Sequence, residues 1–265
     1  PGTHYLGHEG EYSDWPVNKQ NDHNISFYEQ NNFGGYKSYH VFGKYSDFYG
    51  GYWHDDDFGM GRYSTYDDKA GKKIWIWGLS QQGMIWEHLL SDTDGQYVEV
   101  QSGRLFNQSA EGSTFTPFKH MGFPPYATDE WKEYWFPVKQ TKGFVKANPY
   151  GALNIKKEDG WLKIYFSPLQ SFHDRLTVTE AGKTIYETNA NLRPMQTFAD
   201  SVRTGAAMEE LKVVLGKNKL VYQSDPDVDT LSRPLASPAD FDWNSVYGLY
   251  LQGKENIRQR LYSAA

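Results

Sequence analysis

Apolar and polar residues alternate over many short stretches of the chain, at the two-residue period of a β-strand. The alternation is strict over residues 95–101, where it predicts that Tyr97, Glu99 and Gln101 share one face of a strand. Further strand candidates in the first half are residues 38–42, 73–78 and 130–138. Trp75 and Trp77 share a face in one of them, where we expect a buried wall. This pattern predicts an all-β fold.

The second half of the chain carries shorter strand candidates and fewer aromatic residues. Apolar runs separated by turn signals such as Glu180-Ala181-Gly182 are typical of a small antiparallel, immunoglobulin-like β-sandwich. A segment rich in Pro, Asp and Ser follows and is interpreted as a linker. The last residues space their apolar side chains as in a short helix. The predicted parts, in the order sandwich, small sandwich, linker and helix, are residues 1–147, 148–223, 224–243 and 244–265.

Aromatic residues make up 17% of the 265 residues, with 9 Trp, 20 Tyr and 15 Phe. Some of these rings are expected at the surface, where sugars or nucleic-acid bases stack on them. The net charge of -6 disfavours nucleic acid, because phosphate backbones require a basic surface. Membrane insertion is not expected, because no apolar run approaches ~20 residues. The absence of cysteine excludes disulfides and thiolate metal sites. A sugar is therefore the favoured ligand.

Several motifs resemble an uncharacterised bacterial family with a galactose-mutarotase-like β-supersandwich, followed by a small β domain and tetratricopeptide repeats. They are residues 49–57, 71–78, 92–103 and 134–138, while residues 246–253 resemble the helix that leads into the repeats. The family's sandwich begins before the first residue of this chain, so a missing N-terminal segment or a second chain is expected to complete it. The resemblance implies a role in glycan utilisation, with mono- or oligosaccharide as partner and a periplasmic or extracellular location.

The resemblance also implies a catalytic residue. Sugar mutarotases use a Glu base within a Glu-x-Gln stretch on a strand, and Glu99-Val100-Gln101 is similar to that stretch. They also use an upstream His acid, which has no clear counterpart in this chain. On the residues alone, Glu99 is a candidate general base flanked by Tyr97 and Gln101 on its own face. The alternative interpretations are a solvated strand residue or an ion pair with Arg104.

His54-Asp55-Asp56-Asp57 is the densest group of potential ligands in the sequence. Asp55 and Asp57 could bind Ca²⁺ through oxygen, and His54 could act as the acid that partners Glu99. The alternative is an exposed acidic turn, since adjacent residues of an extended strand point in opposite directions. No cofactor other than Ca²⁺ is expected.

The remaining candidates are residues that would position a sugar. Trp53 and Trp131 lie in polar surroundings and are candidates for stacking, and the planar fork of Arg104 could hold a hydroxyl or carboxylate. Three functions stay open. An enzyme would be a glycoside hydrolase or a sugar epimerase or mutarotase that uses Glu99 and His54. A binding module would use only the aromatic residues, and a scaffold would keep a vestigial sugar site.

Overall fold

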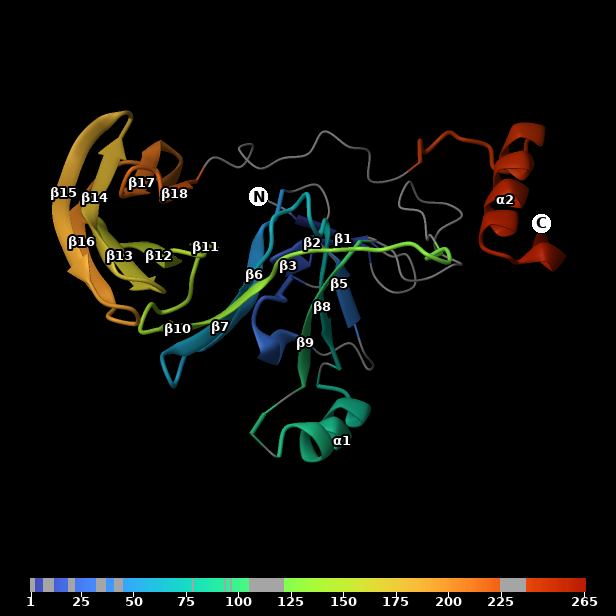
Figure 1. Cartoon of the computed structure of the whole chain (residues 1–265), viewed down its shortest axis with the longest axis horizontal. Helices are drawn as coiled ribbons and strands as arrows, with labels where there is room; N and C mark the ends of the chain where they lie inside the picture. Colours follow the sequence, from blue (N-terminus) through green and yellow to red (C-terminus); the bar gives the residue numbers. More distant parts are fainter. Residues whose placement is uncertain are drawn as a thin grey trace. The chain divides into compact units, whose positions relative to one another are not determined.

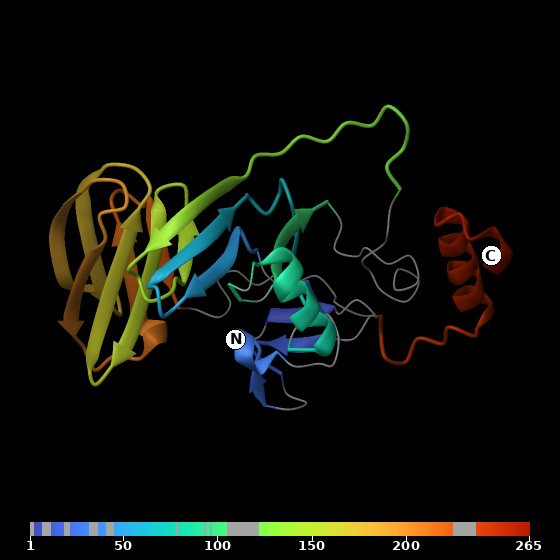
Figure 2. The same cartoon turned by 90° about the horizontal axis from the view of Figure 1, so that it is seen from below.

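The computed structural model of the chain describes residues 3–6, 12–18, 22–31, 37–40, 45–77, 79–92, 94–95, 97–104, 122–224 and 237–265 (Figures 1 and 2). Strands predominate in these residues, as the alternating pattern predicts. The chain divides into two compact units. Unit 1 comprises Pro1–Ser46, Tyr66–Trp131 and Thr230–Ala265, and unit 2 comprises Asp47–Thr65 and Lys132–Asp229.

Unit 2 contains a sandwich of two four-stranded antiparallel sheets (Figure 1). The first sheet has the order β11 (Lys146–Asn148), β12 (Gly151–Glu158), β13 (Trp161–Pro168) and β16 (Phe198–Arg203). The second has the order β15 (Lys183–Leu192), β14 (Phe172–Glu180), β17 (Leu211–Leu215) and β18 (Leu220–Gln223). A short 3-10 helix, η3 (Met208–Glu210), precedes β17. The small antiparallel sandwich is thus present, although this strand order differs from the seven-stranded order of an immunoglobulin constant domain.

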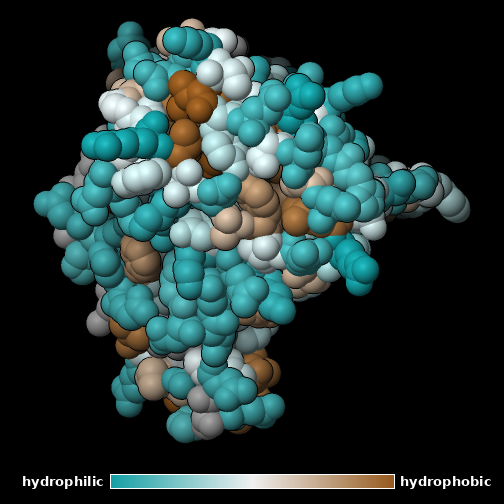
Figure 3. All heavy atoms as spheres, turned by 90° about the vertical axis from the view of Figure 1, so that its left-hand side faces the viewer, coloured by the Kyte–Doolittle hydropathy of each residue, from teal (hydrophilic) through white to brown (hydrophobic). Residues whose placement is uncertain are grey.

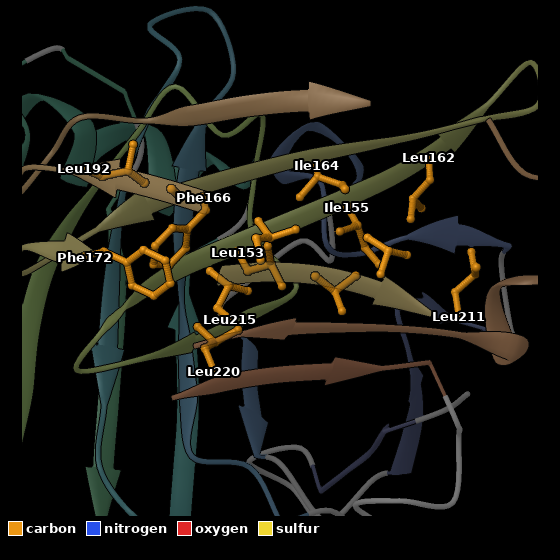
Figure 4. Close-up of a cluster of buried hydrophobic side chains, with 14 of the residues drawn as sticks. Leu153, Ile155, Leu162, Ile164, Phe166, Phe172, Leu192, Leu211, Leu215 and Leu220 are labelled. Carbon is orange, nitrogen blue, oxygen red and sulfur yellow. The ribbon is translucent and has the colours of Figure 1, made fainter. Parts of the chain in front are cut away.

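The core of the sandwich lies between these two sheets. Alternate residues of β13, namely Leu162, Ile164 and Phe166, are fully buried. From the opposite sheet Leu176 and Leu215 are fully buried too. Figure 4 shows Leu162, Ile164, Phe166 and Leu215 pointing into the space between the two layers. Burial of apolar area on this scale is the main force that holds the sandwich together.

A third sheet of unit 2 is built from segments far apart in the sequence. Its order is β10 (Tyr134–Lys139), β7 (Phe58–Tyr63) and β6 (Phe48–Trp53), and both pairings are antiparallel. Phe136 and Val138 of this sheet pack with Ala147 and Ala152 in a second buried cluster. The sheet therefore shares a core with the first strands of the sandwich.

Unit 1 contains smaller sheets and a helix. A three-stranded antiparallel sheet has the order β5 (Lys37–His40), β8 (Gly71–Ile76) and β9 (Val98–Gly103). Two hairpins precede it, β1 (Thr3–Leu6) with β2 (Tyr12–Trp15) and β3 (Val17–Asn18) with β4 (His23–Asn24), followed by the 3-10 helix η1 (Tyr28–Gln30). Helix α1 (Gln81–Leu90) begins after Ser80, whose side chain accepts a hydrogen bond of 3.0 Å from the backbone of Gly83.

The predicted C-terminal helix is present as α2 (Val246–Arg258), followed by the 3-10 turn η4 (Tyr262–Ala264). The Ser245 hydroxyl caps it by accepting a hydrogen bond of 3.0 Å from the backbone of Gly248. Residues 225–236 of the predicted linker lie outside the described residues. Among the helices that the structure describes, none has the length and apolar character needed to cross a membrane.

The predicted domain boundaries stay a prediction, because the two units follow spatial contacts and not chain order. Strands from both sides of residue 147 belong to unit 2.

Candidate functional site

The strands β8 and β9 bring the strongest sequence candidates together in unit 1. Trp75 lies opposite Glu99, and Lys73 lies opposite Gln101. Because side chains alternate along a strand, these four residues share one face of the pair, together with Tyr97 just before β9. We call this set, with Trp77 at the end of β8, the Glu99 face.

Glu99 is held by its two predicted neighbours. The amide nitrogen of Gln101 donates a hydrogen bond to the Glu99 carboxylate. Burial and a hydrogen bond with Glu99, together with the negative charge of Glu99, raise the pKa of Tyr97. The acceptor oxygens of Glu99 are thus fixed between two donors, which orients the carboxylate as a binding group requires.

Lys73 is the residue of this face that the sequence analysis missed. The residue is only 7% exposed, and burial lowers its pKa while the charge of Glu99 opposes that change. The signal that identifies Lys73 is the pairing register of β8 and β9, which depends on the folded sheet and not on the local sequence. A carboxylate and a buried amine next to each other form a pair able to accept and donate protons.

Aromatic rings continue the Glu99 face. The rings of Trp75 and Tyr97 have centroids 6.3 Å apart, and those of Trp75 and Trp77 are 4.7 Å apart and nearly perpendicular, at 83°. Trp86 of helix α1 stacks on Trp77 at 5.7 Å and 16°. Trp75 and Trp77 are half-buried, so the wall that the sequence predicts keeps part of its surface open.

The acidic run of the sequence lies in the turn between β6 and β7 of unit 2. Asp57 has the left-handed φ of 50°, and its carboxylate accepts hydrogen bonds of 2.5 Å from the Tyr52 hydroxyl and from Lys142 Nζ. The Tyr52 hydroxyl in turn accepts the backbone N–H groups of Thr141 and Lys142 at 3.0 Å. Burial acts to raise the pKa of Asp57, but the hydrogen bonds from Lys142 and Tyr52 outweigh it and lower the pKa. Asp57 therefore fastens the turn to the segment after β10.

The other members of the acidic run, His54, Asp55 and Asp56, are exposed in the turn. Within the described part of the chain, no group of three or more His, Asp or Glu side chains could hold a metal ion. Calcium at Asp55 and Asp57 stays a prediction. His54 and Trp53 belong to unit 2, whereas Glu99 belongs to unit 1, so the pairing of His54 with Glu99 also stays a prediction.

Arg104 and Trp131 contribute to a separate cluster of unit 1. The Arg104 guanidinium lies 5.0 Å from the centroid of the Phe123 ring, and Lys69 Nζ lies 3.9 Å from that of Trp131. Lys69 also binds Asp129 at 2.5 Å. This hydrogen bond and the nearby positive charges of Lys69 and Arg104 lower the pKa of Asp129. Arg104 thus acts on Asp129, while the Trp131 ring is covered on one side by Lys69.

The fold and the site together define a β-rich protein. One of its sheet faces carries partly exposed tryptophan rings beside the oriented carboxylate of Glu99. The chain belongs to a family described as a domain of unknown function (DUF5107), whose family model matches residues 1–138. The matched region contains the whole Glu99 face and nearly all of the β10–β7–β6 sheet. No solved structure matches the chain.

Proposed function

We propose that the chain binds carbohydrate on the Glu99 face. The observation that carries this proposal is the position of Tyr97, Glu99 and Gln101 on one sheet face beside the half-buried ring of Trp75. Sugar sites combine an apolar ring face, on which C–H groups stack, with a few oriented polar groups that pair with hydroxyls. Glu99 supplies acceptors, and Gln101 supplies both a donor and an acceptor.

An acid–base reaction on the bound sugar is the catalytic form of this proposal. The buried Lys73 beside Glu99, with its lowered pKa, favours it. In an epimerase or mutarotase step, the Glu99 carboxylate would take the proton of the anomeric hydroxyl while an acid protonates the ring oxygen. The ring bond to the anomeric carbon breaks as the carbonyl forms. Lys73 would serve as that acid or relay the proton. His54, the acid that the sequence suggested, is the alternative.

The finer fold and setting belong to the same proposal. We propose that residues 1–147 form the C-terminal portion of a galactose-mutarotase-like supersandwich, and that the small sandwich and α2 lead toward tetratricopeptide repeats. A periplasmic or extracellular role in glycan utilisation follows from that interpretation. Its support is the resemblance of the sequence motifs together with the β-rich fold.

A fluorescence titration tests the proposal. Tryptophan emission of the full chain is followed against a panel of mono- and oligosaccharides, once with Ca²⁺ and once with EDTA. We expect saturation with one sugar class, and roughly tenfold or greater weakening in Trp75→Ala and Glu99→Gln. Trp161→Ala and Glu187→Gln are matched controls, because both wild-type residues are exposed on the small sandwich.

Two results would decide against it. Saturation that is unchanged in Trp75→Ala and Glu99→Gln would place the sugar elsewhere. An absence of saturation with every sugar would favour the scaffold function. A response that requires Ca²⁺ and is lost in Asp55→Asn would instead support the metal prediction at the acidic turn.

A further inference from the structure

One end of the small sandwich carries an open hollow of about 800 Å³. It is lined by His173 of β14, Asn191 of β15, and Arg193, Pro194, Met195 and Gln196 of the turn that leads to β16. The side of the molecule that carries this sandwich is mainly hydrophilic (Figure 3). The volume lies within the range of small-molecule sites and exceeds the needs of a single ion.

The strands fix the direction in which the lining side chains point. His173 and Asn191 lie opposite each other in the β14–β15 pair. Their neighbours Phe172 and Leu192 are also paired, and both are buried in the core. Since side chains alternate, His173 and Asn191 point outward. Arg193 is exposed directly after the end of β15.

The turn that closes the hollow is held in a strained conformation. Gln196 donates a backbone hydrogen bond of 3.0 Å to the carbonyl of Arg193, as in a four-residue β-turn with Pro194 at its second position. Met195 then has a φ of 62°, a value that favours glycine at this position. Its N–H is held by the carbonyl of Pro168 at 2.8 Å, which fixes the turn against β13.

The chemistry of the lining is that of an anion site. Its six residues include a guanidinium, an imidazole and two amides, and none of the six is acidic. The side-chain oxygen of Gln196 accepts the backbone N–H of Arg193 at 3.1 Å, so its amide N–H groups are the part that can donate to a ligand. The adjacent acid, Asp174, lies on the other face of β14 and binds Lys219 at 3.4 Å. The hollow is therefore positive on a chain whose net charge is -6.

We propose that this hollow binds a sugar that carries a carboxylate, such as a hexuronate. The planar fork of Arg193 matches a carboxylate through two parallel hydrogen bonds. His173, Asn191 and Gln196 supply groups that pair with ring hydroxyls. This is a second site, and it does not require that the Glu99 face bind sugar.

The test is calorimetric titration of the full chain with glucuronate. Glucose, which lacks the carboxylate, and inorganic phosphate are titrated in parallel. We expect saturable binding of glucuronate and binding of glucose and phosphate at least about tenfold weaker. Arg193→Ala should weaken glucuronate binding by a similar factor, and Arg193→Lys should do so partly, because it keeps the charge but loses the fork.

Arg175→Ala is the matched control. Arg175 is an exposed arginine on the same face of β14 as His173, but it lies outside the hollow and pairs with Glu187 at 3.2 Å. Unchanged glucuronate binding in Arg175→Ala supports the inference. Loss of glucuronate binding in Glu99→Gln would assign the binding to the Glu99 face and overturn it. Absent binding, equal binding in Arg193→Ala with an unchanged circular dichroism spectrum, or equal affinity for phosphate would overturn it as well.

Discussion

At the scale of single residues, the two carboxylates that the sequence singled out have different surroundings. Glu99 is oriented by Tyr97 and Gln101 on an open sheet face. The carboxylate of Asp57, by contrast, is engaged in a hydrogen bond with Tyr52 and an ion pair with Lys142. Both have an aromatic residue within two positions in the sequence, so local composition does not separate them. What separates them is the number of donors that the fold supplies: Asp57 meets a lysine and a backbone amide from a segment some distance along the chain.

The role of Asp57 gives a prediction at this scale. Because its pKa is lowered from the usual 3.8, the carboxylate stabilises the folded state fully above that pH and loses this effect as the pH falls toward the folded-state pKa. Asp57→Asn should reduce the free energy of unfolding by about 1–2 kcal/mol at pH 7, a figure discounted for partial exposure. Urea unfolding should show this difference shrinking at pH 3.

Asp56→Asn serves as the control, because Asp56 is exposed in the same turn. Its stability should equal that of the wild type at both pH values. A difference between Asp57→Asn and the wild type that stays constant from pH 7 to pH 3 would contradict an ionised structural role for Asp57.

At the scale of elements, the β10–β7–β6 sheet depends on glycine at positions where a side chain would collide with a neighbouring aromatic ring. A Cβ added to Gly61 of β7 would lie 2.3 Å from Cε2 of Phe136 on the paired strand β10. Phe136 is buried in the cluster shared with the sandwich, so it has little room to move. Gly61→Ala should therefore lower the free energy of unfolding by about 1–3 kcal/mol through overpacking, as measured by urea denaturation.

Gly51→Ala is the matched control on the neighbouring strand β6, because a Cβ there meets nothing within 4 Å. It should be neutral or slightly stabilising. Adding Phe136→Leu to Gly61→Ala should recover part of the loss, since it removes ring atoms from the clash. Equal effects of Gly51→Ala and Gly61→Ala would show that the ring contact has no energetic weight.

The elements also show which parts of the fold and the site can be predicted from the sequence. Alternation and turn signals predicted the strands around Glu99, the small sandwich and the C-terminal helix, because these depend on local periodicity. The pairing of Trp75 with Glu99 and of Lys73 with Gln101 depends on register between separate strands. The hollow around Arg193 depends on a turn in which methionine takes a conformation typical of glycine. Neither the register between two strands nor the conformation of this turn can be read from a single stretch of sequence.

At the scale of the whole molecule, unit 2 is continuous in space but interrupted in sequence. Tyr63 at the end of β7 lies opposite Tyr134 at the start of β10, and residues 66–131 between them belong to unit 1. The fall in aromatic content near residue 148 coincides with the first strands of the sandwich. It gives no sign of the distant pairing between β7 and β10. The sequence alone therefore carries no signal for the pairing of β7 with β10.

The interrupted pairing can be tested by removing the intervening segment. Joining residues 47–65 to 132–224 through an Asn-Gly turn should give a chain that folds, because β7 and β10 then form an ordinary hairpin. We expect one cooperative urea transition that coincides by circular dichroism and tryptophan fluorescence. A chain of residues 148–224 should be less stable, since it lacks Phe136 and Val138 of the shared cluster. Equal stability of the two chains would contradict a shared core.

The same interruption has a consequence for synthesis of the protein on the ribosome. Strand β7 emerges long before β10, so its outer edge waits without its partner while residues 66–131 are translated. An unpaired edge is a template for pairing with other chains, and such exposure is a common origin of aggregation. The last pairing of β10 is made by Lys139, one residue beyond the region shared by the family, and Ala147 and Ala152 of the shared cluster follow later. Expression of the family region alone should therefore produce insoluble protein more readily than expression through the small sandwich.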